Sequence, residues 1–84
     1  MTKNELIDLL KDNSIDKKNP INACALANIS RFANVLLQMD RKTLDYYYEI
    51  DINDLLSSQL PKDEYEVMKS QGWSIRENKI ILYI

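Results

Sequence analysis

Acidic side chains in the second half of this chain are the residues whose type and spacing could do chemistry. Residues 43–84 carry eight Asp and Glu against four Lys and Arg, whereas residues 1–42 carry five against seven. In the stretch TLDYYYEIDI (43–52) three acids alternate, which places them on one face of a β-strand. Converging carboxylates can bind Mg²⁺ or Ca²⁺, or form an acidic surface for a protein partner. The candidate acidic face comprises Tyr47, Asp45, Glu49, Asp51, Asp63, Glu64 and Glu66.

A metal site is the weaker interpretation of these acids. Their spacing matches no EF-hand loop, and the region lacks the glycine that such a loop requires. We therefore expect no metal, and we interpret the acids either as solvated and helix-capping residues or as a partner-binding face. Tyr47 is the best aromatic anchor if it points outward, although pairing with Tyr83 across strands would explain it equally well.

Residues that most enzymes need are missing from the composition. The chain has no histidine, which excludes Ser-His-Asp and Cys-His nucleophiles and the commonest zinc ligand, and its single glycine cannot build a P-loop or a GxGxxG turn. Cys24 is the only cysteine, and we expect it to be a buried small hydrophobe, with a thiol activated by a helix N-terminus as the alternative. We expect no enzyme, no catalytic residue and no cofactor.

Length and composition indicate one small domain over residues 1–84. The chain is 45% apolar and 29% charged, as is usual for globular proteins, and polar residues interrupt its longest apolar stretch, so we expect no membrane span. The N-terminus has a capping pattern and acids where a signal peptide needs an apolar run, which predicts a cytoplasmic protein. Abundant Ile, Asn and Lys suggest AT-rich codons, as in a phage or mobile element of a low-GC bacterium.

Helical periodicity and capping signals predict four helices. Thr2 and Glu5 form a capping box, Asn19-Pro20 can open a long amphipathic helix, Asp51 or Asn53 can cap a short one, and Gly72 suits a helix C-terminus. The predicted helices span about 3–12, 20–39, 52–59 and 61–71.

Period-2 alternation predicts three strands at about 44–50, 73–76 and 79–84, which form a small antiparallel sheet in an α+β fold. Tyr46 and Tyr48 should point inward and Tyr47 outward, and Trp73 should anchor the core. The apolar C-terminal strand KIILYI would pair with its own copy or with a partner strand if it lies at a sheet edge.

Without the first helix, this order of elements resembles that of winged-helix domains. The resemblance covers about two-thirds of the chain and implies a recognition helix at 61–71 and a wing tip at 76–79. The segment PKDEYEVMKSQ carries three acids against two lysines, which argues against DNA reading by that helix.

Two functions follow from these observations. The first is a small non-enzymatic protein-interaction module that binds a host protein as an inhibitor or modulator, or that assembles into a larger complex. The alternative is a winged-helix-like protein that binds nucleic acid through a basic patch outside the recognition helix. The net charge of −2 means that such binding needs a local patch, for which the candidates are Lys11, Lys17, Lys18, Arg41 and Lys42.

Overall fold

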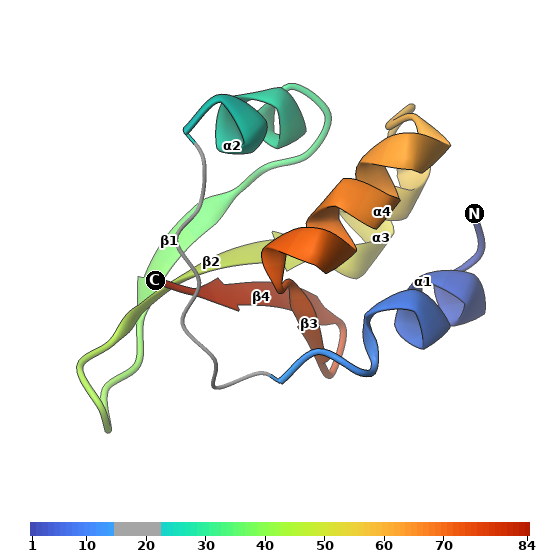
Figure 1. Cartoon of the computed structure of the whole chain (residues 1–84). Coiled ribbons are helices and arrows are strands. Elements are labelled where there is room, and N and C mark those ends of the chain that lie inside the picture. The colour runs from blue at the N-terminus through green and yellow to red at the C-terminus, as the bar shows by residue number, and fades with distance from the viewer. Residues whose placement is uncertain (15–22) are drawn as a thin grey trace.

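The computed structural model describes residues 1–14 and 23–84, which form four helices and one four-stranded antiparallel sheet. The predicted α+β class is therefore confirmed (Figure 1). Among these helices none is long and apolar enough to cross a bilayer. In chain order the elements are α1 (Lys3–Leu10), α2 (Ala23–Ser30), β1 (Leu36–Met39), β2 (Tyr46–Asp51), α3 (Ile52–Ser57), α4 (Lys62–Gln71), β3 (Ser74–Arg76) and β4 (Lys79–Tyr83).

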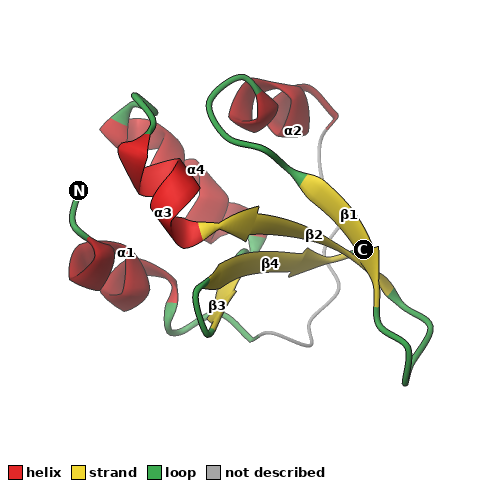
Figure 2. Cartoon of the chain, turned by 180° about the vertical axis from the view of Figure 1, so that it is seen from behind, coloured by secondary structure: helices red, strands yellow, loops and turns green. Residues whose placement is uncertain are grey.

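Helices α1, α3 and α4 lie together against one face of the sheet, and α2 lies apart from them, close to β1 (Figures 1 and 2). We call the helix-covered face the inner face; it carries Ile50, Ile80 and Leu82, all buried in the main core. Trp73 is 0% exposed, which confirms it as a core anchor. Each fully buried Leu or Ile contributes about 1.5–3 kcal/mol, so this shared core holds the two layers together.

The strand order is β1-β2-β4-β3, so β4 lies inside the sheet and β1 and β3 form its edges. The C-terminal strand is paired on both sides, so the edge position on which its pairing with a copy or a partner strand depended is not present. Tyr48 pairs with Leu82 and packs against the core, and Tyr47 pairs with Tyr83 on the opposite, outer face. Tyr46 has the inward orientation of Tyr48 but remains exposed.

The predicted helix over residues 20–39 is wrong beyond residue 30. Its proposed start at Pro20 lies outside the described residues, α2 ends at Ser30, and Leu36–Met39 form a strand that pairs with β2. The Asn34 amide donates to Asp54 Oδ2 at 2.9 Å. In a continuing helix this amide would donate to the carbonyl of residue 30 instead. An apolar run this short fits either period, and here pairing with β2 overrides the helical pattern.

Local signals at the helix ends are confirmed. Thr2 and Glu5 form the capping box, and Asp51 caps α3 by accepting the amides of Asn53 and Asp54. Gly72 ends α4 with φ 95°, a left-handed conformation in which a residue without a β-carbon meets no steric penalty.

Glu77 in the β3–β4 turn also has a positive φ, 56°. A side chain in this conformation costs about 1–2 kcal/mol. We predict that Glu77→Gly raises the free energy of unfolding by about 0.5–1 kcal/mol, after the extra freedom of glycine in the unfolded chain is deducted. The matched control is Glu66→Gly on the exposed side of α4, which should lower the free energy of unfolding by about 1 kcal/mol. Urea unfolding measures both, and destabilisation by both substitutions would contradict the left-handed turn.

Candidate functional site

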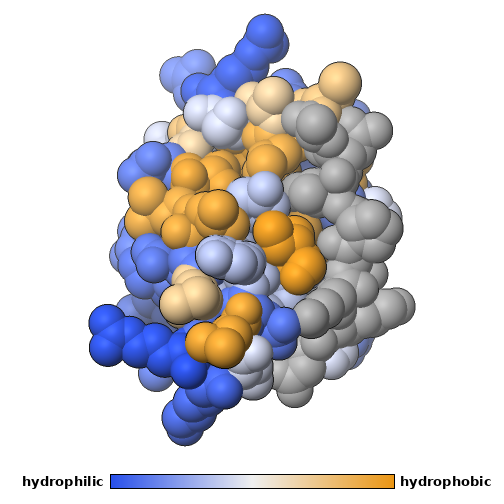
Figure 3. Space-filling model, turned by 90° about the vertical axis from the view of Figure 1, so that its left-hand side faces the viewer, coloured by the Kyte–Doolittle hydropathy of each residue, from blue (hydrophilic) through white to orange (hydrophobic). Residues whose placement is uncertain are grey.

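Exposed apolar side chains gather at the end of the sheet where β1 forms the edge. Met39 lies beside Tyr46 on the neighbouring strand, and the Ile84 amide donates to the Tyr46 carbonyl at 3.1 Å, so the three residues form a row across the inner face. Figure 3 views this side of the molecule and shows the hydrophobic atoms gathered there. We define the apolar edge surface by its members, which are 39% to 66% exposed: Leu36, Leu37, Met39, Leu44, Tyr46 and Ile84.

Backbone groups of β1 also face outward on this surface. The Asp40 amide donates to the Asp45 carbonyl at 2.8 Å, which makes this a hydrogen-bonded pair of the β1–β2 ladder. Because such pairs alternate with non-bonded ones, Gln38 and Leu36 also bond to β2, and the N–H and C=O groups of Leu37 and Met39 point away from it. A strand edge with outward backbone groups and apolar side chains is suited to bind another strand.

The hairpin between β1 and β2 holds Leu44 in an unusual position. Leu44 has φ 62° and is 66% exposed, although this left-handed conformation is normally taken by glycine or asparagine. Asp40 maintains the turn, because its carbonyl accepts the Leu44 amide at 2.7 Å and its carboxylate accepts the Lys42 amide at 2.8 Å. A bulky apolar side chain is thus displayed at the hairpin at a cost in backbone strain.

A polar and aromatic cluster on the outer face ties this hairpin to the rest of the sheet. Arg76 Nη1 donates to the Tyr83 hydroxyl at 3.2 Å, and that hydroxyl donates to Asp40 Oδ2 at 3.0 Å. The Tyr47 and Tyr83 rings lie 5.1 Å apart, and the Arg76 guanidinium lies 5.2 Å from the Tyr47 ring centre. Tyr47 therefore packs against Tyr83 across the strands, which is the alternative that the sequence left open.

Charges in this cluster stabilise one another. The amide of Lys42 and then the hydroxyl of Tyr83 lower the pKa of Asp40, because both donate to its ionised form. The hydrogen bond to Tyr83 is also the main cause that raises the pKa of Arg76. Asp40 and Arg76 thus remain charged, and their role here is to fix the hairpin rather than to exchange protons.

The acidic residues do not form one surface. Asp63, Glu64 and Glu66 are on α4, which covers the inner face, whereas Tyr47, Glu49 and Asp51 share the outer face. Asp45 precedes β2 in the hairpin. Within the described ranges, no three His, Cys, Asp or Glu side chains are placed to hold a metal ion.

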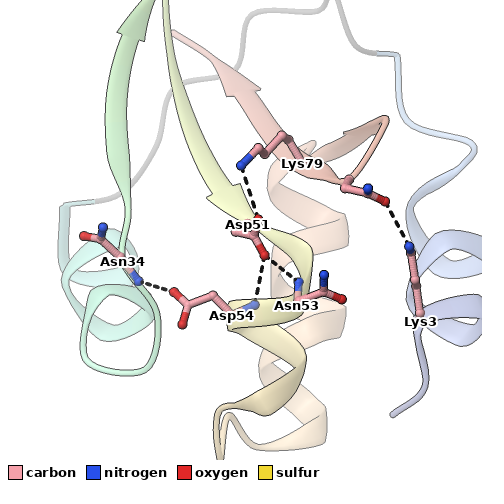
Figure 4. A network of polar contacts seen from close by, with 7 residues as sticks. Lys3, Asn34, Asp51, Asn53, Asp54 and Lys79 are labelled. Carbon is pink, nitrogen blue, oxygen red and sulfur yellow. Dashed lines mark hydrogen bonds and ion pairs between the residues drawn. The ribbon is translucent and has the colours of Figure 1, made fainter.

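Asp51 has a structural role (Figure 4). It accepts the amides of Asn53 and Asp54, and its Oδ2 receives a hydrogen bond from Lys79 Nζ at 3.2 Å. The amide of Asp54 and then the ammonium group of Lys79 lower the pKa of Asp51. This carboxylate therefore caps α3 and joins it to β4. Asp54, in turn, accepts the Asn34 amide ahead of β1.

The basic candidates are separated as well. Arg41 and Lys42 are exposed in the hairpin. Lys11 directly follows α1, a helix that lies away from the hairpin (Figures 1 and 2), and its Nζ lies 3.5 Å from Asp8 Oδ1. Lys17 and Lys18 fall outside the described residues. Two adjacent cations make a small local patch.

Cys24 was expected in the core, and this expectation is wrong, because the residue is exposed on α2. It lines an open pocket of about 280 Å³ with Ala27, Asn28 and Arg31. The expectation rested on how often free cysteines are buried, whereas α2 buries Ile29 and packs Leu26 against the core, and Cys24 lies off that side.

The apolar edge surface itself was missed by sequence reasoning. The four residues of β1 were assigned to a helix, and Leu44 was assigned to the inward face of a strand. The signal that could have found it is LLQM (36–39), a run without charge, proline or glycine beside a turn-forming segment.

No protein-family model, curated protein or solved structure matches this chain.

The Asp40 cluster leads to a pH prediction. Because folding lowers the pKa of Asp40 below its ordinary 3.8, its stabilisation is present above that pH and is lost as the pH falls through the folded value. We predict that Asp40→Asn makes the free energy of unfolding fall less steeply below about pH 4 than it does in the wild type. Tyr83→Phe should reduce the slope in the same direction, and the two changes should be non-additive because they remove one shared bond. Urea unfolding from pH 6 to pH 2.5 measures this, and an unchanged slope in Asp40→Asn would contradict it.

Proposed function

We propose that this chain is a non-enzymatic, cytoplasmic protein-interaction module and that it binds protein through the apolar edge surface. The observation that carries the proposal is that six apolar side chains are exposed on the edge strand β1, on its hairpin and at the neighbouring ends of β2 and β4, beside outward backbone groups. Single exposed apolar residues are ordinary on protein surfaces, but contiguous ones beside an open strand favour protein contacts. Burial of these side chains supplies affinity, and the strand edge supplies orientation.

The composition of the surface supports this choice over the acidic face. Interface centres are depleted of charge and enriched in aromatic residues and methionine, and the row contains one residue of each kind, Tyr46 and Met39. The acids, by contrast, are divided between two faces, and Asp51 is already bound within the fold. We infer that the acids act as capping and solubilising residues around an apolar contact.

The chemistry of a module of this kind is assembly rather than turnover. Its composition fits a phage or mobile element, so a host protein or a larger complex of the element is the class of partner that we propose. Nucleic-acid binding receives less support. Among the described basic candidates, Arg41 and Lys42 lie together, and two cations make a small patch.

Capture experiments with matched variants test the proposal. The affinity-tagged chain is incubated with lysate of the source organism and of its host, and bound proteins are quantified by mass spectrometry. Met39→Lys should abolish stoichiometric capture, because it places a charge within the apolar row. Val67→Lys is the control, since Val67 is a comparably exposed apolar residue on α4, and it should leave capture unchanged.

A charge reversal on α4 tests the competing interpretation. The double variant Asp63→Lys and Glu66→Lys changes the acids without touching the apolar edge surface. If this variant loses the captured protein while Met39→Lys retains it, the binding surface is the acidic helix and the proposal is wrong.

A further inference from the structure

We propose that the occupant of the apolar edge surface is a second copy of this chain. The two copies pair β1 with β1 in antiparallel orientation, about a two-fold axis that passes beside Gln38, and their sheets join into one. This inference rests on the proposed function, because it names the partner of the same surface. It places self-association at β1, whereas the sequence had suggested the C-terminal strand, which lies inside the sheet.

Backbone geometry permits this pairing without any change in the fold. Leu37 and Met39 direct their N–H and C=O groups away from β2, and they are separated by one residue. With Gln38 opposite Gln38 of the second copy, each Leu37 lies opposite a Met39 and the two exchange both bonds. The pairing satisfies the outward groups of both residues in both copies.

Side chains on the two faces are self-complementary in this register. Leu37 of one copy meets Met39 of the other on the inner face, where both are now about half exposed, and each is next to Tyr46 or Tyr48 on β2. On the outer face Gln38 meets its own copy, and two amide side chains can bond to each other. The strand Leu36–Met39 contains no lysine, no other charge and no proline, so it lacks the features that keep edge strands apart.

The bounds of β1 select this register from its neighbours. With Gln38 central, Leu37 and Met39 of each copy both bond to residues within the Leu36–Met39 strand of the other copy. With Leu37 or Met39 central, one of these two residues would instead lie opposite Val35 or Arg41, outside the strand.

The opposite edge of the sheet does not offer the same surface. β3 is three residues long, and the Arg76 side chain lies on the outer face, where it donates to the Tyr83 hydroxyl. Asn13, just after α1, donates to the Trp73 carbonyl at 2.7 Å immediately ahead of β3. One edge is thus suited to pairing, which gives a closed dimer rather than a filament.

Sedimentation velocity over a range of protein concentrations tests the dimer. We expect the wild type to dimerise reversibly. Leu37→Pro removes an outward donor while leaving the bonds to β2, and it should weaken the dimer at least about tenfold, because each copy loses a donated bond. Met39→Lys should weaken it through charge at the interface. Val67→Lys should have no effect, and circular dichroism checks that each variant remains folded.

One further variant, with its control, tests the register. In a Cys24→Ser background, Gln38→Cys should form an intermolecular disulfide under mild oxidation, since opposed residues in a non-hydrogen-bonded pair have Cα atoms about 4.5 Å apart. Val67→Cys in the same background should not.

A monomer at all concentrations, or a dimer that survives both Leu37→Pro and Met39→Lys, would overturn the inference. A monomeric chain that still captures another protein, and loses it in Met39→Lys, would overturn the self-pairing while supporting the proposed function. The Gln38→Cys crosslink, absent in Val67→Cys, would support this dimer and its register.

Discussion

The pairing of β1 with β2 is the interaction on which the surface of this protein depends. It ends the helical course of the chain after α2, and it creates both the open edge and the hairpin that displays Leu44. The Asn34–Asp54 bond turns the chain into β1, and Asp40 closes the hairpin at its other end. The carboxylates of Asp54 and Asp40 therefore shape an apolar surface.

The two faces of the sheet have different roles at this end of the molecule. On the outer face Arg76, Tyr83 and Asp40 connect β3, β4 and the hairpin, so the hairpin is held from one side. On the inner face the row Met39, Tyr46 and Ile84 stays exposed. A surface fixed in this way is pre-organised, and pre-organisation lowers the entropic cost of binding.

Local physics made most of the fold predictable. The capping box at Thr2, the left-handed Gly72, the alternation in β2 and the C-terminal hairpin each follow from a few neighbouring residues, and all are present. β1 could not be predicted in the same way, because its four residues fit a helix as well as a strand, and only pairing with β2 decides between them. The exposure of Leu44 likewise follows from a left-handed turn position that has no glycine to mark it in the sequence. The candidate site was missed because neither the pairing of β1 with β2 nor the left-handed Leu44 has a distinctive signal in the sequence.

Amide hydrogen exchange along residues 36–40, resolved by NMR, tests the central claim most directly. If β1 is an edge strand, the amides of Gln38 and Asp40, which bond to β2, should exchange slowly in dilute protein, and those of Leu37 and Met39 should exchange rapidly. Alternating protection of this kind is the expected result. Uniform protection of all five amides in dilute protein would indicate a helix, and uniform rapid exchange would indicate no strand; either would contradict the account.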